Sequence, residues 1–169
     1  RTVADRFEDR EDRANLDNLI AAGSQCLIRT PAGRPAVIAG YHWFNDWGRD
    51  TLISLPGLTF CSGRPEEGFD ILSSLAEHEK DGLLPNCFSD HSREKSYNSV
   101  DATLWFFWAV QQALRYTGAF ETVRARLWPV MKKMIRHFMS GTAMGVFMDD
   151  GGLLQAGHEG SNPTWMDAT

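Results

Sequence analysis

The sequence has little of what several classes of protein require. It contains three cysteines in 169 residues, without framework spacing, which excludes a disulfide scaffold and favours reduced thiols in a cytosolic protein. No apolar run reaches the roughly 20 residues that a bilayer-spanning helix needs, so we expect no membrane partner. The net charge of -5 disfavours a nucleic-acid partner.

The signatures of cofactor sites and of nucleophilic catalysis are also missing. There is no Gly-rich phosphate loop, no serine nucleophile elbow and no metal-ligand spacing of His and Cys, so we expect no cofactor and no metal ion. Asp149 and Asp150 are a weak cation candidate, because adjacent acids more often form a solvated turn. His42 and His158 are weak ligand candidates for a similar reason, since a lone histidine is more often structural.

Apolar residues are plentiful, at 43%, and their spacing predicts helices. The predicted helices cover about residues 12–28, 48–61, a segment starting at Pro65, 99–116 and 119–139. The first has a stripe that we expect to be buried, formed by Leu16, Leu19, Ile20, Gly23 and Leu27. Pro56 should kink the second. Short strands are expected around residues 36–39 and 153–155, inside the links.

The helices alternate in character, which predicts two layers. The first, third and fifth are apolar on one side, as outer helices are, whereas the second and fourth are apolar nearly all round, as inner helices are. The links from inner to outer helices are short, at 62–64 and 117–118. Those from outer to inner are long, at about 29–47, 80–98 and 140–164. An up-down arrangement places all the long links at one end, where long ordered loops are usually functional.

Each long link ends at an aspartate beside aromatic residues. Asp50, Asp101 and Asp167 are these acids. The nearby aromatic residues are Trp43, Phe44, Trp47, Trp105 and Trp165. Indole rings beside carboxylates suit sugar recognition, because the rings stack on pyranose C–H faces and the charges bind hydroxyls.

Each acid also has a plain structural interpretation. Asp50 suits a first-turn carboxylate that interacts with the helix dipole or pairs with Arg49. Asn98 and Asp101 have the spacing of a capping box, and so do Thr164 and Asp167.

Several segments together resemble the amylo-alpha-1,6-glucosidase family, the glucosidase domain of glycogen debranching enzymes of bacterial or archaeal type. They are residues 40–51 (GYHWFNDWGRDT), 97–105 (YNSVDATLW), 152–157 (GLLQAG) and 164–168 (TWMDA). The resemblance implies an all-α fold, an (α/α)6 toroid of six helical hairpins. It also implies inverting hydrolysis of alpha-1,6 branch points in a branched alpha-glucan such as glycogen or limit dextrin.

The resemblance also implies roles for residues. Asp167 falls on the position of the general acid and Asp50 on that of the residue that grips the non-reducing glucose, although the opposite allotment stays open. The expected sugar contacts are Trp43, Phe44, Trp47, Arg49, Asn98, Asp101, Trp105 and Trp165.

Five helices and the start of a sixth make up roughly the N-terminal half of such a toroid. We therefore expect residues 1–169 to be a partial domain with further sequence on both sides. The general base is expected downstream, and the fragment alone is expected to be inactive. The alternatives are a glucoamylase-like or trehalase-like toroid glycosidase, a non-catalytic carbohydrate-binding helical scaffold, and a helical interaction module without a ligand.

A partial toroid leaves inner helices without part of their cover, so we predict that the fragment associates with itself through the apolar surface at its cut edge. Light scattering at increasing concentration should show a mass that rises above that of a monomer. A constant monomer mass at high concentration would contradict this prediction.

Overall fold

The computed structural model describes residues 10–42, 44–87, 96–158 and 161–166. Its helices are α1 (Arg10–Ser24), α2 (Gly48–Leu55), the π-helix η2 (Pro56–Phe60), α3 (Pro65–Ala76), α4 (Asp101–Thr117), α5 (Phe120–Arg126) and α6 (Trp128–Ser140). Two antiparallel hairpins accompany them, β1 (Leu27–Arg29) with β2 (Pro35–Val37) and β3 (Phe147–Met148) with β4 (Leu154–Gln155). The chain is therefore mostly helical, as the sequence predicts.

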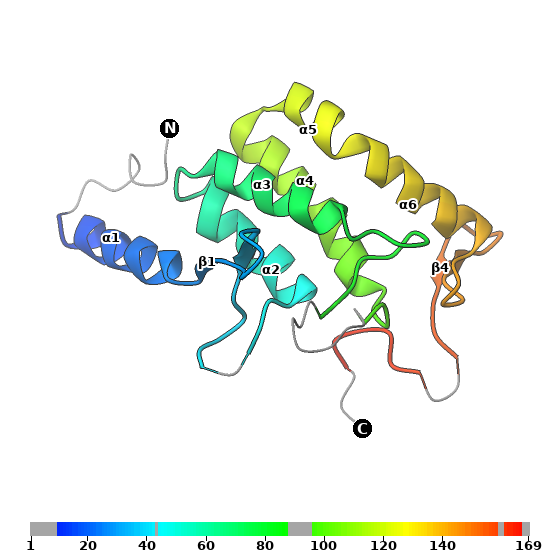
Figure 1. Cartoon of the computed structure of the whole chain (residues 1–169). Coiled ribbons are helices and arrows are strands. Elements are labelled where there is room, and N and C mark those ends of the chain that lie inside the picture. The colour runs from blue at the N-terminus through cyan, green and yellow to red at the C-terminus, as the bar shows by residue number, and fades with distance from the viewer. Residues whose placement is uncertain (1–9, 43, 88–95, 159–160, 167–169) are drawn as a thin grey trace.

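The helix α4 lies at the centre of the arrangement. It packs against α2, η2, α3 and α5, and Figure 1 shows it behind α3 and between α2 and α5. Its buried side chains join those of its neighbours in one core. The members of that core include Leu52, Leu55, Phe60, Phe69, Leu72, Phe106, Val110, Leu127 and Met134. The fourth predicted helix thus has the central position that its apolar surface indicates.

The first predicted helix is wrong at its C-terminal end and in its burial. The helix α1 ends at Ser24, and Leu27 begins the strand that pairs with β2, in a register of Leu27 opposite Val37. Among the described elements α1 has its main contact with η2, and α1 projects away from the other helices in Figure 1. Leu19, expected in a buried stripe, is 69% exposed. Helical spacing of apolar residues predicts a helix, but it does not show that another element packs against the apolar side.

Proline decides two helix boundaries. Pro56 starts the π-helix that follows α2, so the predicted kink is a change of helix type. The segment predicted as one helix over 119–139 divides at Leu127, where φ is −116°. Pro129 lies in the first turn of α6 and has no N–H to donate to the preceding turn, so a new helix begins there.

The short links lie at residues 61–64 and 118–119 and the first two long links at 25–47 and 77–100, close to the predicted bounds. The long links also meet. The short link after α4 turns at Gly118, whose φ of 67° favours glycine and whose N–H donates to the Leu114 carbonyl. At the other end, the N–H of Gly48 donates to the Asn86 carbonyl at 2.9 Å, and the N–H of Val100 donates to the Pro163 carbonyl at 2.8 Å. These bonds join all three long links at the starts of α2 and α4.

A second, smaller apolar cluster lies beneath two of these links. It contains Leu83, Val100, Phe138 and Val146, with Tyr97 packed against it. In the described part of the chain, no helix is both long and apolar enough to cross a membrane.

The contact between α3 and η2 offers a test of packing with two glycines. A Cβ on Gly68 of α3 would lie 2.5 Å from the Thr59 hydroxyl and 2.7 Å from the Phe60 ring. We predict that Gly68→Ala lowers the free energy of unfolding by about 1–3 kcal/mol, because neither group can move without disturbing the core.

The matched control is Gly57→Ala in η2, where an added Cβ meets nothing within 4 Å. It should leave stability unchanged or raise it by up to about 1 kcal/mol, through the lower helix propensity of glycine. Urea denaturation measures the free energy of unfolding of both variants. Equal changes in Gly68→Ala and Gly57→Ala would contradict the prediction.

Candidate functional site

The start of α2 is held by a residue from another link. Trp47 at the N-cap supplies no side-chain cap, and the orphan N–H groups of Gly48 and Arg49 instead donate to the backbone and side-chain oxygens of Asn86, at 2.9 and 3.3 Å. Asn86 is buried, and its own N–H donates to the Ser96 carbonyl. Asn86 is not predictable from the sequence, because its role depends on residues almost 40 positions away and no local pattern marks it.

Arg49 pairs with Asp101, not with the adjacent Asp50. Its Nε lies 2.8 Å from Asp101 Oδ2 and its Nη2 lies 3.0 Å from Asp101 Oδ1, which makes a bidentate ion pair. The two side chains are only 13% and 14% exposed. The first turn of α2 is thereby bound to the first turn of α4.

The same carboxylate also holds the third long link. The N–H of Trp165 donates to Asp101 Oδ2 at 3.0 Å, and the Ser99 hydroxyl donates to Asp101 Oδ1. Ser99 Oγ also accepts a hydrogen bond from Nη2 of Arg49 at 3.3 Å. Residues from all three predicted motifs therefore meet at Asp101.

The capping box predicted from Asn98 and Asp101 is wrong. The N-cap of α4 is Val100, and the Ser99 hydroxyl accepts the N–H of Ala102 at 3.4 Å. The Asn98 side chain accepts a hydrogen bond from the Ser96 hydroxyl instead. Asp101 is therefore available for contacts outside its own helix.

Asp101 is ionised more readily than an ordinary aspartate. Burial alone would raise the pKa of its carboxyl, but the hydrogen bonds from Arg49 and Ser99, the charge of Arg49 and the N–H of Trp165 together lower that pKa below 3.8. The carboxylate at the meeting point of the links is therefore negatively charged at neutral pH.

Asp50 lies in a different environment, in the lining of an open depression. The cavity has a volume of about 290 Å³ and is lined by Ala39, Phe44, Trp47, Arg49 and Asp50. The carboxylate of Asp50 is exposed, and so is half of Phe44. The depression thus combines aromatic rings, a guanidinium and an accessible carboxylate, as sugar recognition requires.

The other predicted site residues lie in varied positions. Trp105 is half-buried and packs edge-to-face on Trp108, with ring centroids 5.2 Å apart, at the margin of the main core. Trp165 is 69% exposed. Trp43 and Asp167 lie outside the described residues.

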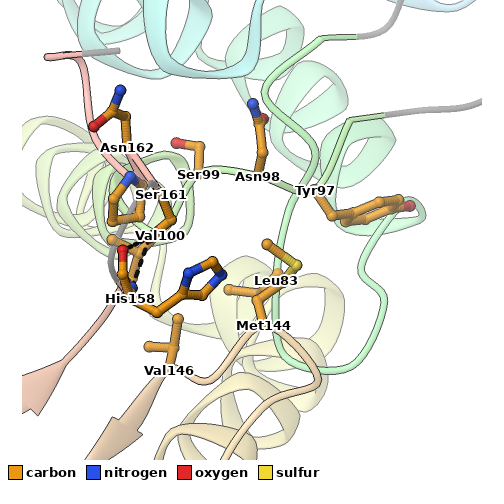
Figure 2. Close-up of a pocket in the computed structure, with 12 residues that line it drawn as sticks. Leu83, Tyr97, Asn98, Ser99, Val100, Met144, Val146, His158, Ser161 and Asn162 are labelled. Carbon is orange, nitrogen blue, oxygen red and sulfur yellow. Dashed lines mark hydrogen bonds between the residues drawn. The ribbon is translucent and has the colours of Figure 1, made fainter. Parts of the chain in front are cut away.

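A second cavity, of about 220 Å³, is lined by residues of the second and third long links, among them Asn98, Ser99 and His158. Figure 2 shows Asn98, Ser99 and Asn162 on one wall and the His158 ring directed into the space towards Met144. The loop containing His158 is closed by hydrogen bonds between the backbone of His158 and the Ser161 hydroxyl. Asn98, a predicted sugar contact, thus lines this cavity and not the depression at Asp50.

Asp149, one of the two weak candidates for cation binding, accepts hydrogen bonds within its own turn. The Asp149 carboxylate accepts the N–H groups of Gly151 and Leu153 and the Gln155 amide, and so closes the turn between β3 and β4. These hydrogen bonds lower the pKa of Asp149. Within residues 10–42, 44–87, 96–158 and 161–166 no group of three or more His, Cys, Asp or Glu could hold a metal ion. The three cysteines are free thiols.

The lowered pKa of Asp101 predicts how stability depends on pH. Because the folded pKa lies below the unfolded one, the ionised carboxylate stabilises the fold above about pH 4, and this contribution is lost as pH falls through the folded pKa. Asp101→Asn should therefore lower the free energy of unfolding by about 2–3 kcal/mol at pH 7, and the difference from the parent should shrink at pH 3.

Urea denaturation between pH 3 and 7 measures this difference. The control is Asp70→Asn, which breaks the more exposed ion pair between Asp70 and Arg126 and should cost less than about 1 kcal/mol at pH 7. If the free energy of unfolding of Asp101→Asn differs from that of its parent by the same amount at pH 3 and at pH 7, the prediction is wrong.

The chain is similar to known glycogen-debranching proteins in sequence. The glycogen debranching enzyme of Saccharomyces cerevisiae is 38% identical over 82 residues, which make up 46% of this chain and 5% of that protein. This chain therefore corresponds to a small part of that relative. A family model described as amylo-alpha-1,6-glucosidase matches residues 20–169, which include all three long links. Because this match extends over most of the sequence, the chain belongs to the amylo-alpha-1,6-glucosidase family.

Proposed function

We propose that this chain supplies part of the active site of a glycogen debranching-type glycosidase, which hydrolyses alpha-1,6-glucosidic bonds at the branch points of glycogen or limit dextrin. The observation that carries the proposal is the depression at the start of α2. There Phe44, Trp47 and Asp50 line an open cavity of about 290 Å³. Membership of the amylo-alpha-1,6-glucosidase family supports the assignment of this hydrolysis reaction.

In this proposal the depression holds the non-reducing glucose. The exposed carboxylate of Asp50 accepts hydrogen bonds from sugar hydroxyls, while Phe44 and Trp47 stack on the C–H faces of the ring. Arg49 lines the same depression, but its Nε and Nη2 groups are engaged by Asp101. Its contribution is therefore a positive charge of fixed position beside Asp50.

Asp167 is the proposed general acid. It follows Trp165 by two residues, and the N–H of Trp165 is bound to Asp101, next to Arg49. A general acid must carry its proton near neutral pH, which requires a carboxyl with a raised pKa. Inversion further requires a second carboxylate about 6.5–9.5 Å away that activates a water on the opposite face of the sugar.

We also propose that the helices form part of an (α/α)6 toroid, in which residues 1–169 are a partial domain. The mostly helical content, the central place of α4, and the meeting of the long links at the starts of α2 and α4 support this architecture. In a toroid of this kind the site lies at the end where the long links gather.

The test uses the protein that carries this chain, with branched dextrin as substrate and free glucose as the product measured. Asp167→Asn should lower kcat by about 10²–10⁴-fold, since it removes general acid catalysis. Asp50→Asn should mainly raise KM, because it weakens the grip on the glucose in ground and transition state alike.

Glucosyl fluoride separates the two roles, because fluoride leaves without protonation. The Asp167→Asn variant should hydrolyse the fluoride with a kcat close to that of the parent, whereas Asp50→Asn should show the same raised KM with the fluoride as with branched dextrin. Restoration of activity by the fluoride in Asp50→Asn and not in Asp167→Asn would exchange the two roles. The control is Asp17→Asn on α1, an exposed carboxylate far from the depression along the chain. Glucose release from linear but not from branched dextrin would contradict the proposed substrate, and full activity of both site variants would contradict the proposed site.

A further inference from the structure

We propose that Asp101 is a positioning residue, whose carboxylate fixes the segment that carries Asp50 relative to the segment that leads to Asp167. The inference rests on the proposed function and adds a role to it. Asp101 is the residue to which the other two motifs are bound, and this role does not require contact with the sugar.

Hydrogen bonds within the protein already use the acceptor capacity of the Asp101 carboxylate. Oδ2 accepts Arg49 Nε at 2.8 Å and the Trp165 N–H at 3.0 Å, while Oδ1 accepts Arg49 Nη2 at 3.0 Å and the Ser99 hydroxyl. A carboxylate offers about four acceptor positions, so these donors occupy it fully. A sugar hydroxyl would have to displace one of them.

The partners of Asp101 come from distant parts of the chain. Arg49 precedes Asp101 by 52 residues and Trp165 follows it by 64. An aspartate that serves only its own helix accepts N–H groups of the first turn, but here Ser99 accepts the N–H of Ala102 in that turn. The carboxylate of Asp101 therefore serves the junction between links.

Both partners of Asp101 lie close to a proposed site acid along the chain. Arg49 is adjacent to Asp50, and Trp165 is two residues before Asp167, so a shift at Asp101 passes to both proposed site acids through one or two peptide units. The bond from Val100 N–H to the Pro163 carbonyl ties the third link to α4 a second time. A displacement of about 1 Å in a catalytic group can cost about 100-fold in rate.

The experiment compares Asp101→Asn and Asp101→Ala with their parent, in the protein that carries this chain. We expect kcat for glucose release from branched dextrin to fall by about 100-fold, with KM changed by less than about threefold. We also expect amide exchange of the peptide containing Trp165 to become at least about tenfold faster, because its acceptor is lost. If the alanine variant does not fold, the asparagine variant carries the test.

Two controls separate positioning from general loss of stability. Gly68→Ala destabilises the contact between α3 and η2, and Asp70→Asn breaks the ion pair with Arg126. Both should keep the parental kcat and the parental exchange rate at Trp165, even where the melting temperature of Gly68→Ala matches that of Asp101→Asn.

The outcomes distinguish this inference from the proposed function. A raised KM with parental kcat would make Asp101 a direct sugar ligand and overturn the inference, while loss of activity in Asp167→Asn would leave the proposed function standing. If the amide exchange rate at Trp165 in the Asp101 variants equals that of the parent, the inference is overturned, whether or not glucose is released. If the parent protein releases no glucose, the proposed function fails, and the exchange rate at Trp165 alone decides whether Asp101 fixes the third link.

Discussion

The ion pair between Arg49 and Asp101 is the contact on which the arrangement of the site depends. Its two nearly parallel N–H to O bonds fix orientation as well as distance, which a single charge contact does not. The pair is largely removed from water, so it is screened less than an exposed pair, and removing either partner would leave a partly buried charge. Ser99 and the Trp165 N–H supply the further hydrogen bonds to the paired side chains that make such burial tolerable.

The hydrophobic core explains why this contact forms at all. The first turns of α2 and α4 come together because the bodies of both helices pack in one cluster, in which Leu52, Phe106 and Val110 are almost fully buried. The second cluster, around Leu83 and Val100, holds the long links over the start of α4. Apolar burial thus places the charged groups, and the charged groups then fix the ends of loops that have little core of their own.

The site divides the three motif aspartates by environment. Asp50 is exposed in a depression lined with aromatic rings, whereas Asp101 is surrounded by donors. In the sequence the two look alike, since each follows a long link and starts an apolar helix. Their separation into a ligand-facing acid and a loop-binding acid depends on which donors the folded chain brings within 3 Å, so the function proposed for each follows from tertiary contacts.

The sequence by itself determined the helical class, the central position of α4, the approximate lengths of the links that precede α5 and the family, because these follow from local periodicity and from residue types within short segments. It also indicated that Arg49, Asp101 and Trp165 would gather at one end. Only the tertiary structure decided that Arg49 pairs with Asp101 and not with its neighbour Asp50, that Asn86 caps α2, and that Leu27 leaves the first helix for a strand. Each of these depends on a partner far away in the chain, and the free energy of such a contact is not encoded in the residues on either side of it.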